Sequence, residues 1–297
     1  MTDQPRVVVE LSVAEQWSAS GPFAERALEL VKQSLESCPR SSLQAFKVVV
    51  CSAPAPHSGL GSGTQLALAI VSGVRQLCQA PALDFSQLVG SVGRGRRSAV
   101  GSYGFQLGGL IWEEGRLPGE LLGKLKRRIE VPSEWRVVLV KMPYSEGLSG
   151  EGEQSAFERL PAVPADVTRQ LMELAEEQIL PAAERGDFPA FTEATYQYGR
   201  LAGNCFASVQ GGPFASPQIA AGVQRLRKLG VKGVGQSSWG PTIFAFAKDK
   251  GSAAELIDRI GVLDEFSEAE IACAPPNNEG ARIETIPSQS VSGQSRP

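Results

Sequence analysis

The chain has 297 residues, of which 42% are hydrophobic and 21% charged, a balance typical of a globular protein with one large domain or two ordinary ones. Its 29 basic and 32 acidic residues give a formal net charge of -3, which excludes the strong basic field that nucleic-acid binding needs. The sequence holds no apolar run long enough for a membrane span, no signal-peptide core at its start, and five cysteines without a Cys-x-x-Cys pair. We therefore expect a cytoplasmic protein with reduced thiols and with no nucleic-acid or membrane partner.

Predicted strands and helices alternate along the chain. Valine-rich and alternating apolar runs predict strands, and apolar residues at helical spacing predict helices. The predicted strands cover 6–11, 43–51, 110–112, 135–142, 242–247 and 268–274. The predicted helices cover 22–38, 65–77, 165–184, 188–208, 217–229 and 253–260, and another begins at Asp84, whose side chain can cap its first turn. This mixture predicts an α/β or α+β fold.

The chain is expected to divide into two domains and a tail. We place the boundary just before the apolar strand that begins at Trp135. The division gives an N-terminal phosphate-binding domain at 1–133 and a C-terminal α+β domain at 134–286. The composition after Ser288, rich in Ser, Gly, Gln and Arg, predicts a disordered tail at 287–297.

A glycine-rich loop from Pro56 to Gln65 joins a predicted strand to a helix that is apolar nearly all round. Glycine lets the backbone approach an anion, and a helix start supplies unpaired N–H donors with a partial positive charge. A tight turn without ligand is the alternative, but the apolar helix favours a phosphate site. The candidate phosphate-binding residues are Gly59, Leu60, Gly61, Ser62, Gly63, Thr64 and Gln65. His57, at the mouth of the loop, is either structural or a hydrogen-bonding partner of the substrate.

A second glycine-rich region carries Arg94, Arg96 and Arg97, followed by Ser98. Guanidinium groups bind phosphate through paired hydrogen bonds. A solvated basic turn is the alternative, but the glycines that follow this run favour a binding site. We expect these residues to bind substrate, with Arg97 also a candidate catalytic residue.

The stretch from Gly233 to Thr242 is dense in hydrogen-bond donors. Gln236, Ser237, Ser238 and Trp239 offer an amide, two hydroxyls and an indole N–H, a set too polar for a core. We expect them to bind substrate, and Gln236 and His57 join Arg97 as catalytic candidates. An acidic loop at 146–153 either binds Mg²⁺ alongside phosphates or is only hydrophilic, so the metal ligands stay open.

These segments resemble the conserved motifs of the GHMP kinases. The run Gly59-Leu60-Gly61-Ser62 after a proline is similar to their second motif, and the loop from Gly233 to Gly240 takes the place of their third. The resemblance implies an α+β, two-domain fold with a ribosomal S5 domain 2-like N-terminal domain and a ferredoxin-like C-terminal domain. The active site is then expected between the two domains.

Within this superfamily the chain is most similar to the β-ribofuranosylaminobenzene 5′-phosphate synthase family. The similarity extends over 56–65, 93–98, 147–151 and 235–241, in the same order along the chain. It implies a transferase of tetrahydromethanopterin biosynthesis that condenses phosphoribosyl pyrophosphate with 4-aminobenzoate or 4-hydroxybenzoate and releases CO₂ and pyrophosphate. The resemblance further implies Mg²⁺ as cofactor, a role for the three arginines at phosphate or at the arene carboxylate, and small-molecule partners only. A homodimer is compatible with it.

Two departures from the kinases support this branch. Gly101 stands where mevalonate-type kinases carry the aspartate that activates the substrate hydroxyl, and Gly63 replaces a serine that binds Mg²⁺. An ATP-dependent GHMP small-molecule kinase is therefore the less favoured alternative. A non-catalytic ligand-binding paralogue is another, because nothing at the start of the chain matches the Arg-Leu-His-Phe-Gly-like strand with which this family begins; Met1–Val7 resembles the segment after it. Either the start is assigned too far downstream or part of the site is lacking.

Overall fold

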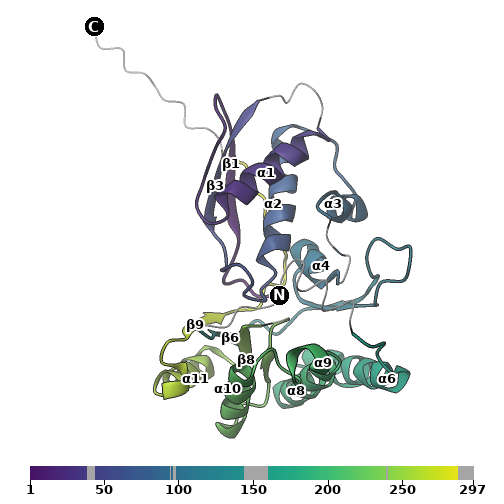
Figure 1. Ribbon diagram of the computed structural model, residues 1–297, viewed down its shortest axis with the longest axis vertical. Coiled ribbons are helices and arrows are strands. Elements are labelled where there is room, and N and C mark those ends of the chain that lie inside the picture. Colours follow the sequence, from purple (N-terminus) through teal and green to yellow (C-terminus); the bar gives the residue numbers. More distant parts are fainter. Residues whose placement is uncertain (39–43, 94, 96–97, 144–159, 239, 287–297) are drawn as a thin grey trace.

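The computed structural model describes residues 1–38, 44–93, 95, 98–143, 160–238 and 240–286. It consists of two halves stacked along the long axis, with the N-terminal half above the C-terminal half in Figure 1. The described elements of the N-terminal half are β1 (Val8–Ala14), β2 (Ser18–Ser20), α1 (Ala24–Leu35), β3 (Ala45–Ser52), α2 (Ser62–Leu77), α3 (Phe85–Ser91), α4 (Val100–Leu107), β4 (Leu110–Glu113) and β5 (Leu125–Ile129).

A three-stranded sheet in the order β1-β3-β2 forms one layer of the N-terminal half, and α1 and α2 form the other (Figure 1). Strand β3 alternates buried Phe46, Val48 and Val50 with more exposed positions, so one face of the sheet is apolar. The buried faces of the two helices, which include Val31 and Ile70, pack against this face. The predicted burial of α2 is confirmed, because Leu66, Ala67, Leu68, Ile70, Val71 and Val74 are all buried along it.

A second, smaller unit of this half consists of α3, α4 and the antiparallel pair β4–β5. Asp84 caps α3 as predicted, since its carboxylate accepts from the amide of Gln87 while the Gln87 side chain accepts from the amide of Asp84. The ring of Phe85 stacks on Tyr103 of α4 with 4.7 Å between centroids. The stacked rings hold α3 against α4.

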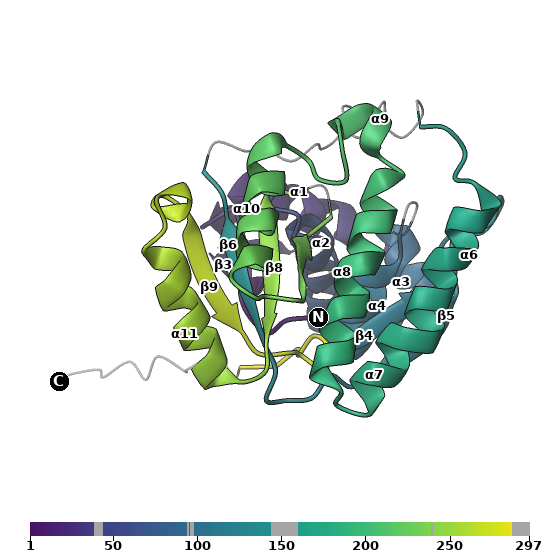
Figure 2. The ribbon, with the colours of Figure 1, turned by 90° about the horizontal axis from the view of Figure 1, so that it is seen from below.

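The C-terminal half is built on a four-stranded antiparallel sheet in the order β7-β8-β6-β9. Its described elements are β6 (Arg136–Lys141), α6 (Ala165–Glu173), the π-helical turn η2 (Leu174–Ile179), α7 (Leu180–Glu184), α8 (Phe188–Asn204), α9 (Ala207–Gln210), α10 (Pro217–Lys228), β7 (Val234–Gln236), β8 (Thr242–Ala247), α11 (Lys250–Gly261), the 3₁₀ turn η3 (Asp264–Phe266) and β9 (Glu270–Ala274). Helices separate its first strand from its second and its third from its fourth, the arrangement of a ferredoxin-like β-α-β-β-α-β unit. Figure 2 shows these helices from below, with the sheet behind them.

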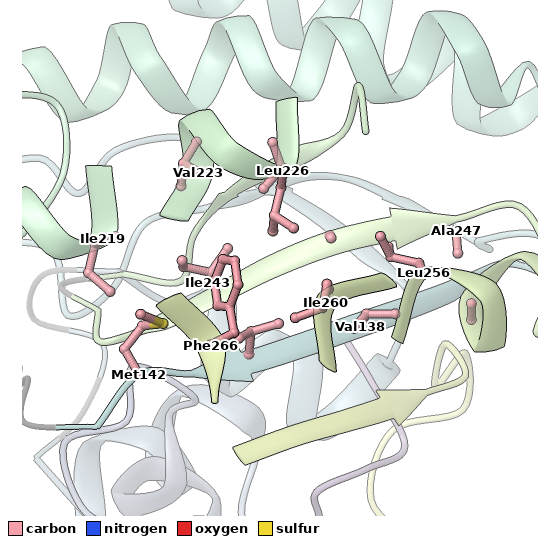
Figure 3. Close-up of a cluster of buried hydrophobic side chains, with 14 of the residues drawn as sticks. Val138, Met142, Ile219, Val223, Leu226, Ile243, Ala247, Leu256, Ile260 and Phe266 are labelled. Carbon is pink, nitrogen blue, oxygen red and sulfur yellow. The ribbon is translucent and has the colours of Figure 1, made fainter. Parts of the chain in front are cut away.

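The core of this half lies between the sheet and the helices α10 and α11. Central strand β6 places Val138 opposite Ala245 of β8 on one side and Cys273 of β9 on the other. Figure 3 shows Val138 with Ile243 and Phe266 among the packed apolar side chains of this cluster. A separate cluster around Trp135, Phe191 and Leu180 joins α7 and α8 to the end of β5.

The segment after β9 leaves the C-terminal half and packs on the N-terminal half. The amide of Gly109 donates to Asn277 O at 2.6 Å, and the amide of Ala281 donates to Phe105 O at the same distance. The Asn278 side chain accepts from the amide of Val131 at 3.0 Å and donates to its carbonyl oxygen at 2.8 Å. Figure 2 shows this segment, in yellow, beside the N-terminus. The chain therefore connects the two halves twice, once before β6 and once after β9.

The α+β, two-domain prediction is confirmed. Among the described elements, the strands β2, β5 and β7, the helix α4 and the turn η3 were not predicted as such. Strand β5 was hidden by its sequence, Leu-Lys-Arg-Arg-Ile, because three of its five residues are charged; Lys126 and Arg127 instead form ion pairs with Glu176 and Glu184. The tail at 287–297 lies outside the described residues. Among the helices that the structure describes, none is long and apolar enough to cross a membrane.

Candidate functional site

The glycine loop adopts a left-handed backbone at three positions just before α2. The φ angles of His57, Gly59 and Gly61 are 57°, 77° and 70°. Gly61 is the N-cap of α2, and no side chain caps this helix. The amides of Thr64 and Gln65 donate to Gly61 O at 3.0 and 3.1 Å, which leaves the preceding amides of the first turn for another acceptor. An uncapped helix start next to a glycine loop is an arrangement that binds anions.

Two glycines of this loop have different surroundings. A Cβ atom on Gly61 would meet nothing within 4 Å, so the space in front of the helix start is open. A Cβ on Gly59 would lie 2.2 Å from Ser237 O and 2.9 Å from Gly240 O. Only glycine therefore allows the loop to touch the C-terminal half at this point, while Gly61 faces space that a ligand can occupy.

The contact between the glycine loop and the loop after β7 is the centre of the site. The hydroxyl of Ser237 donates to Gly59 O at 2.9 Å, and its amide donates to Thr242 O at 2.9 Å. The structure thus brings together two of the segments that the sequence predicted, from opposite halves of the chain. His57 and Ser238 are exposed at this junction.

The side chain of Gln236 is engaged at both ends. Its Oε1 accepts from the amide of Ala215 at 2.6 Å, and its Nε2 donates to Ser238 O at 2.7 Å. The amide group therefore shapes the loop in this structure, and the catalytic role of Gln236 stays a prediction. Ser237 is likewise committed to Gly59, so both residues act as positioning residues in this arrangement.

The start of α4 lies next to the first turn of α2. The Gln65 side chain donates to Gly101 O at 2.8 Å, and a Cβ on Gly101 would meet the Thr64 methyl group at 3.7 Å. Glu113, which the sequence analysis did not identify, fixes this helix start. Its two carboxylate oxygens accept from the Ser98 hydroxyl and from the Ala99 amide, each at 2.8 Å.

A cavity of about 800 Å³ opens beyond the start of α4. It lies between β4–β5 on one side and the helical layer of α6, η2 and α8 on the other. Its lining is mainly apolar and aromatic, with Val100, Trp112, Leu171, Ala175, Tyr198 and Phe246 among the residues that face it. The cavity could not be predicted from the sequence, because each of these residues has the pattern of an ordinary core position.

Most charged groups around this cavity are paired with one another, and Glu113 is instead held by the Ser98 hydroxyl and the Ala99 amide. The indole of Trp112 donates to Glu176 Oε1 at 3.3 Å, and Lys126 forms an ion pair with the same carboxylate. The hydrogen bond from Lys126 is the main cause that lowers the pKa of Glu176. Burial raises the pKa of Tyr198, with smaller contributions from Cys205 and Glu113. The walls of the cavity are therefore largely apolar and neutral.

Several predicted site residues lie outside the described residues: Arg94, Arg96, Arg97, Trp239 and the acidic loop at 146–153. Their roles stay predictions. Within the part of the chain that the structure describes, no three His, Cys, Asp or Glu side chains gather in a way that could hold a metal ion. The described residues thus provide no cluster of side-chain ligands for Mg²⁺.

The comparisons with known proteins agree with this geometry. Residues 179–262 match the family model described as GHMP kinases C terminal. The chain is 26% identical over 284 residues to a beta-ribofuranosylphenol 5′-phosphate synthase of Methanothermobacter thermautotrophicus, an alignment that covers 86% of this chain and 84% of the relative. It is 25% identical to the protein of the same name from Archaeoglobus fulgidus, over 95% of this chain and 90% of the relative.

Solved structures share the whole fold. A homoserine kinase from Cytophaga hutchinsonii superposes with a TM-score of 0.64 at 14% identity, covering 94% of this chain and 89% of the kinase. A mevalonate pyrophosphate decarboxylase from Streptococcus pyogenes superposes with a TM-score of 0.62 at 11% identity, covering 95% of this chain and 100% of the other. The chain has the GHMP kinase fold, and the match of residues 179–262 lies in its C-terminal half. The predicted resemblance and the predicted enzyme class, a transferase, are confirmed.

Proposed function

We propose that this GHMP-fold transferase condenses phosphoribosyl pyrophosphate with a 4-substituted benzoate and releases CO₂ and pyrophosphate. The observation that carries the proposal is the uncapped start of α2, open in front of Gly61 and held against the C-terminal half through Gly59. Such a site binds a phosphate group between the two halves. The relatives supply the reaction, because the product in their name is the 5′-phosphate of a ribofuranosyl phenol.

The choice of benzoate follows from the same name. A ribofuranosyl phenol is the product that 4-hydroxybenzoate gives, whereas 4-aminobenzoate gives the corresponding aniline. We therefore propose 4-hydroxybenzoate as the preferred acceptor and 4-aminobenzoate as the weaker one. The product places the enzyme in tetrahydromethanopterin biosynthesis, as the resemblance of the sequence implies.

The proposed reaction balances without an added acid or base. The bond between the ribose C1 and the pyrophosphate oxygen breaks, and the pyrophosphate leaves with the electron pair. The ring carbon that carries the carboxylate forms the new bond to C1. The bond to the carboxylate then breaks, CO₂ leaves, and its electron pair restores the aromatic ring. The protein has to bind the leaving group, align the ring carbon with C1 and exclude water.

The described residues can meet these needs. The amides at the start of α2 and the open space at Gly61 suit a phosphate group of the donor. Ser237 and Gln236 hold the loop that closes the site from the other half. Arg94, Arg96 and Arg97 are proposed to neutralise the remaining phosphates or the arene carboxylate, and Mg²⁺ is proposed to accompany the pyrophosphate.

The test of this proposal measures the release of CO₂ from the carboxyl group of the benzoate. The protein is incubated with phosphoribosyl pyrophosphate, Mg²⁺ and carboxyl-labelled 4-hydroxybenzoate, and labelled CO₂ and pyrophosphate are counted in parallel. Equal amounts of the two support the proposal. Pyrophosphate without CO₂ indicates hydrolysis of the donor, and ADP formation from ATP with an alcohol acceptor indicates the kinase alternative; either result overturns the proposal.

Two glycine variants provide a matched pair for this assay. Gly61→Ala and Gly186→Ala both place an alanine at a left-handed position, with φ of 70° and 67° and no atom within 4 Å of the new Cβ. The backbone strain is therefore similar. Only Gly61 lies at the proposed phosphate site, so Gly61→Ala is expected to raise the KM for phosphoribosyl pyrophosphate at least tenfold while Gly186→Ala leaves it unchanged.

A further inference from the structure

We infer that the cavity between β4–β5 and α6–α8 is the binding site for the aromatic ring of the acceptor. This inference rests on the proposed function for the identity of the ligand, a planar 4-substituted benzoate. The cavity itself, and its position beside the start of α4, are features of the structure.

The position of the cavity suits a second substrate. Ser98 and Val100, at the start of α4, form part of its wall. The next residue, Gly101, contacts both Thr64 and Gln65 in the first turn of α2. A single helix start therefore separates the cavity from the proposed phosphate site, so ligands in the two places are neighbours.

The lining suits an aromatic ring. The cavity of about 800 Å³ falls within the usual size range of small-molecule sites, which are mostly apolar with few polar groups. Trp112 and Tyr198 meet edge to face with 6.3 Å between ring centroids and 77° between planes, and both line the cavity. A further planar ring can pack against this pair in the offset or edge-on geometry that aromatic groups prefer.

The low polarity of the walls also suits loss of CO₂. The carboxylates and the lysine nearest to Trp112 are already paired with each other, as in the Lys126–Glu176 ion pair. An arene carboxylate brought among apolar walls loses hydration, whereas the CO₂ that it becomes is neutral. Such surroundings favour the product side of decarboxylation.

The polar groups that remain at the cavity are few and defined. The Tyr198 hydroxyl makes no hydrogen bond with another described residue in the structure, and Glu113 and Ser98 sit at the end nearest the phosphate site. The Tyr198 hydroxyl can donate or accept one hydrogen bond, and the Glu113 carboxylate can accept one from the 4-hydroxyl group of the ring. The cavity thus combines an apolar body with polar atoms at one end.

Calorimetric titration with 4-hydroxybenzoate tests the inference, in the presence of inorganic pyrophosphate, which cannot react. Leu171 and Gln170 are neighbours on α6, but only Leu171 lines the cavity, whereas Gln170 is exposed. Leu171→Trp fills the cavity and is expected to weaken binding of 4-hydroxybenzoate at least tenfold. Gln170→Trp, the matched control, is expected to bind it like the unaltered protein, and both variants are expected to bind pyrophosphate equally.

A second pair of variants tests the cavity without the risk that a large core substitution causes misfolding. Met172 lies at the exposed rim of the cavity, so Met172→Asp adds a repelling charge there without disturbing the core. It is expected to weaken benzoate binding, and Gln170→Asp is not. Unchanged affinity in both Leu171→Trp and Met172→Asp, or no benzoate binding by the unaltered protein, overturns the inference.

The outcomes separate this inference from the proposed function. If the unaltered protein releases CO₂ from 4-hydroxybenzoate and the cavity variants keep the same affinity and KM, the function stands and the cavity assignment falls. If the cavity variants lose benzoate binding but the unaltered protein forms no CO₂ with phosphoribosyl pyrophosphate, the assignment stands and the function falls.

Discussion

The hydroxyl of Ser237 donates a hydrogen bond to the carbonyl oxygen of Gly59 at 2.9 Å, across the junction of the two halves. These residues are far apart in the sequence, and the loops that carry them are the two described segments predicted to bind substrate. The bond therefore couples the geometry of the phosphate loop to the position of the C-terminal half.

Ser237→Ala removes this bond and is expected to lower the free energy of unfolding by about 1 kcal/mol, the usual net contribution of one hydrogen bond. Urea denaturation measures the change. Ser238→Ala is the matched control, because Ser238 is exposed and its carbonyl, not its side chain, accepts from Gln236. An equal loss in both variants contradicts the role of the Ser237 bond.

Gly59→Ala is expected to be more severe. The new Cβ would lie 2.2 Å from Ser237 O, and the residue would keep a φ of 77°. A clash with main-chain atoms adds to the strain of a left-handed alanine, so we expect a loss of at least about 2 kcal/mol in the free energy of unfolding. Gly61→Ala, with open space at its Cβ, is expected to lose no more than about 1 kcal/mol. The comparison fails if thermal and urea unfolding rank the two variants in the opposite order.

Glu113→Gln tests the anchor of α4. The glutamine keeps the shape of the side chain, but its NH₂ group cannot accept from Ser98 or Ala99, and the negative charge near the start of α4 is lost. We expect a loss of about 1–2 kcal/mol in the free energy of unfolding and a raised KM for the benzoate. Glu15→Gln, at an exposed position that does not line the cavity, is the control and is expected to change neither value.

In the protein expressed with Met1 as its first residue, the α-amino group makes stability depend on pH. Burial, with a smaller contribution from Arg128, lowers its pKa from 8.0 to about 6, and the group donates to Gly109 O. The unfolded chain therefore binds more protons than the folded one between pH 6 and 8, and stability rises with pH across this window. The full difference is about 3 kcal/mol, present above pH 8 and lost as the pH falls through 6.

Urea unfolding at closely spaced pH values between 5.5 and 8.5 measures this dependence. Acetylation of the α-amino group removes its titration, so the acetylated protein is the control. A slope that is the same before and after acetylation contradicts the assignment to Met1.

Local chemistry made part of the structure predictable. The capped start of α3 at Asp84, the apolar strand β6 and the helix α2 behind its glycine loop all depend on neighbours in the sequence. Strand β5 could not be found in this way, because Lys126 and Arg127 are compatible with a strand only once Glu176 and Glu184 lie opposite them. Long-range pairing of this kind leaves no local pattern.

The same distinction holds for the candidate site. The glycine loop and the segment at 233–242 carry their own chemical signals, and the structure brings them into contact. Gln236 could be predicted as a site residue, but the partners of its amide, Ala215 and Ser238, become apparent only after folding. The cavity was missed for a related reason: Trp112, Leu171 and Tyr198 have the composition of a core, and only the tertiary packing leaves space between them.

The return of the chain after β9 has a consequence for how the protein is made. The amide of Gly109 donates to Asn277 O, and Phe105 O accepts from the amide of Ala281. During translation these partners leave the ribosome only after nearly all of the C-terminal half has been synthesised. The N-terminal half is synthesised first but forms its last hydrogen bonds only after the C-terminal half has been made. A fragment that stops before Asn277 lacks the hydrogen-bond partners of Gly109 and Phe105, which follow the binding loop in the N-terminal half.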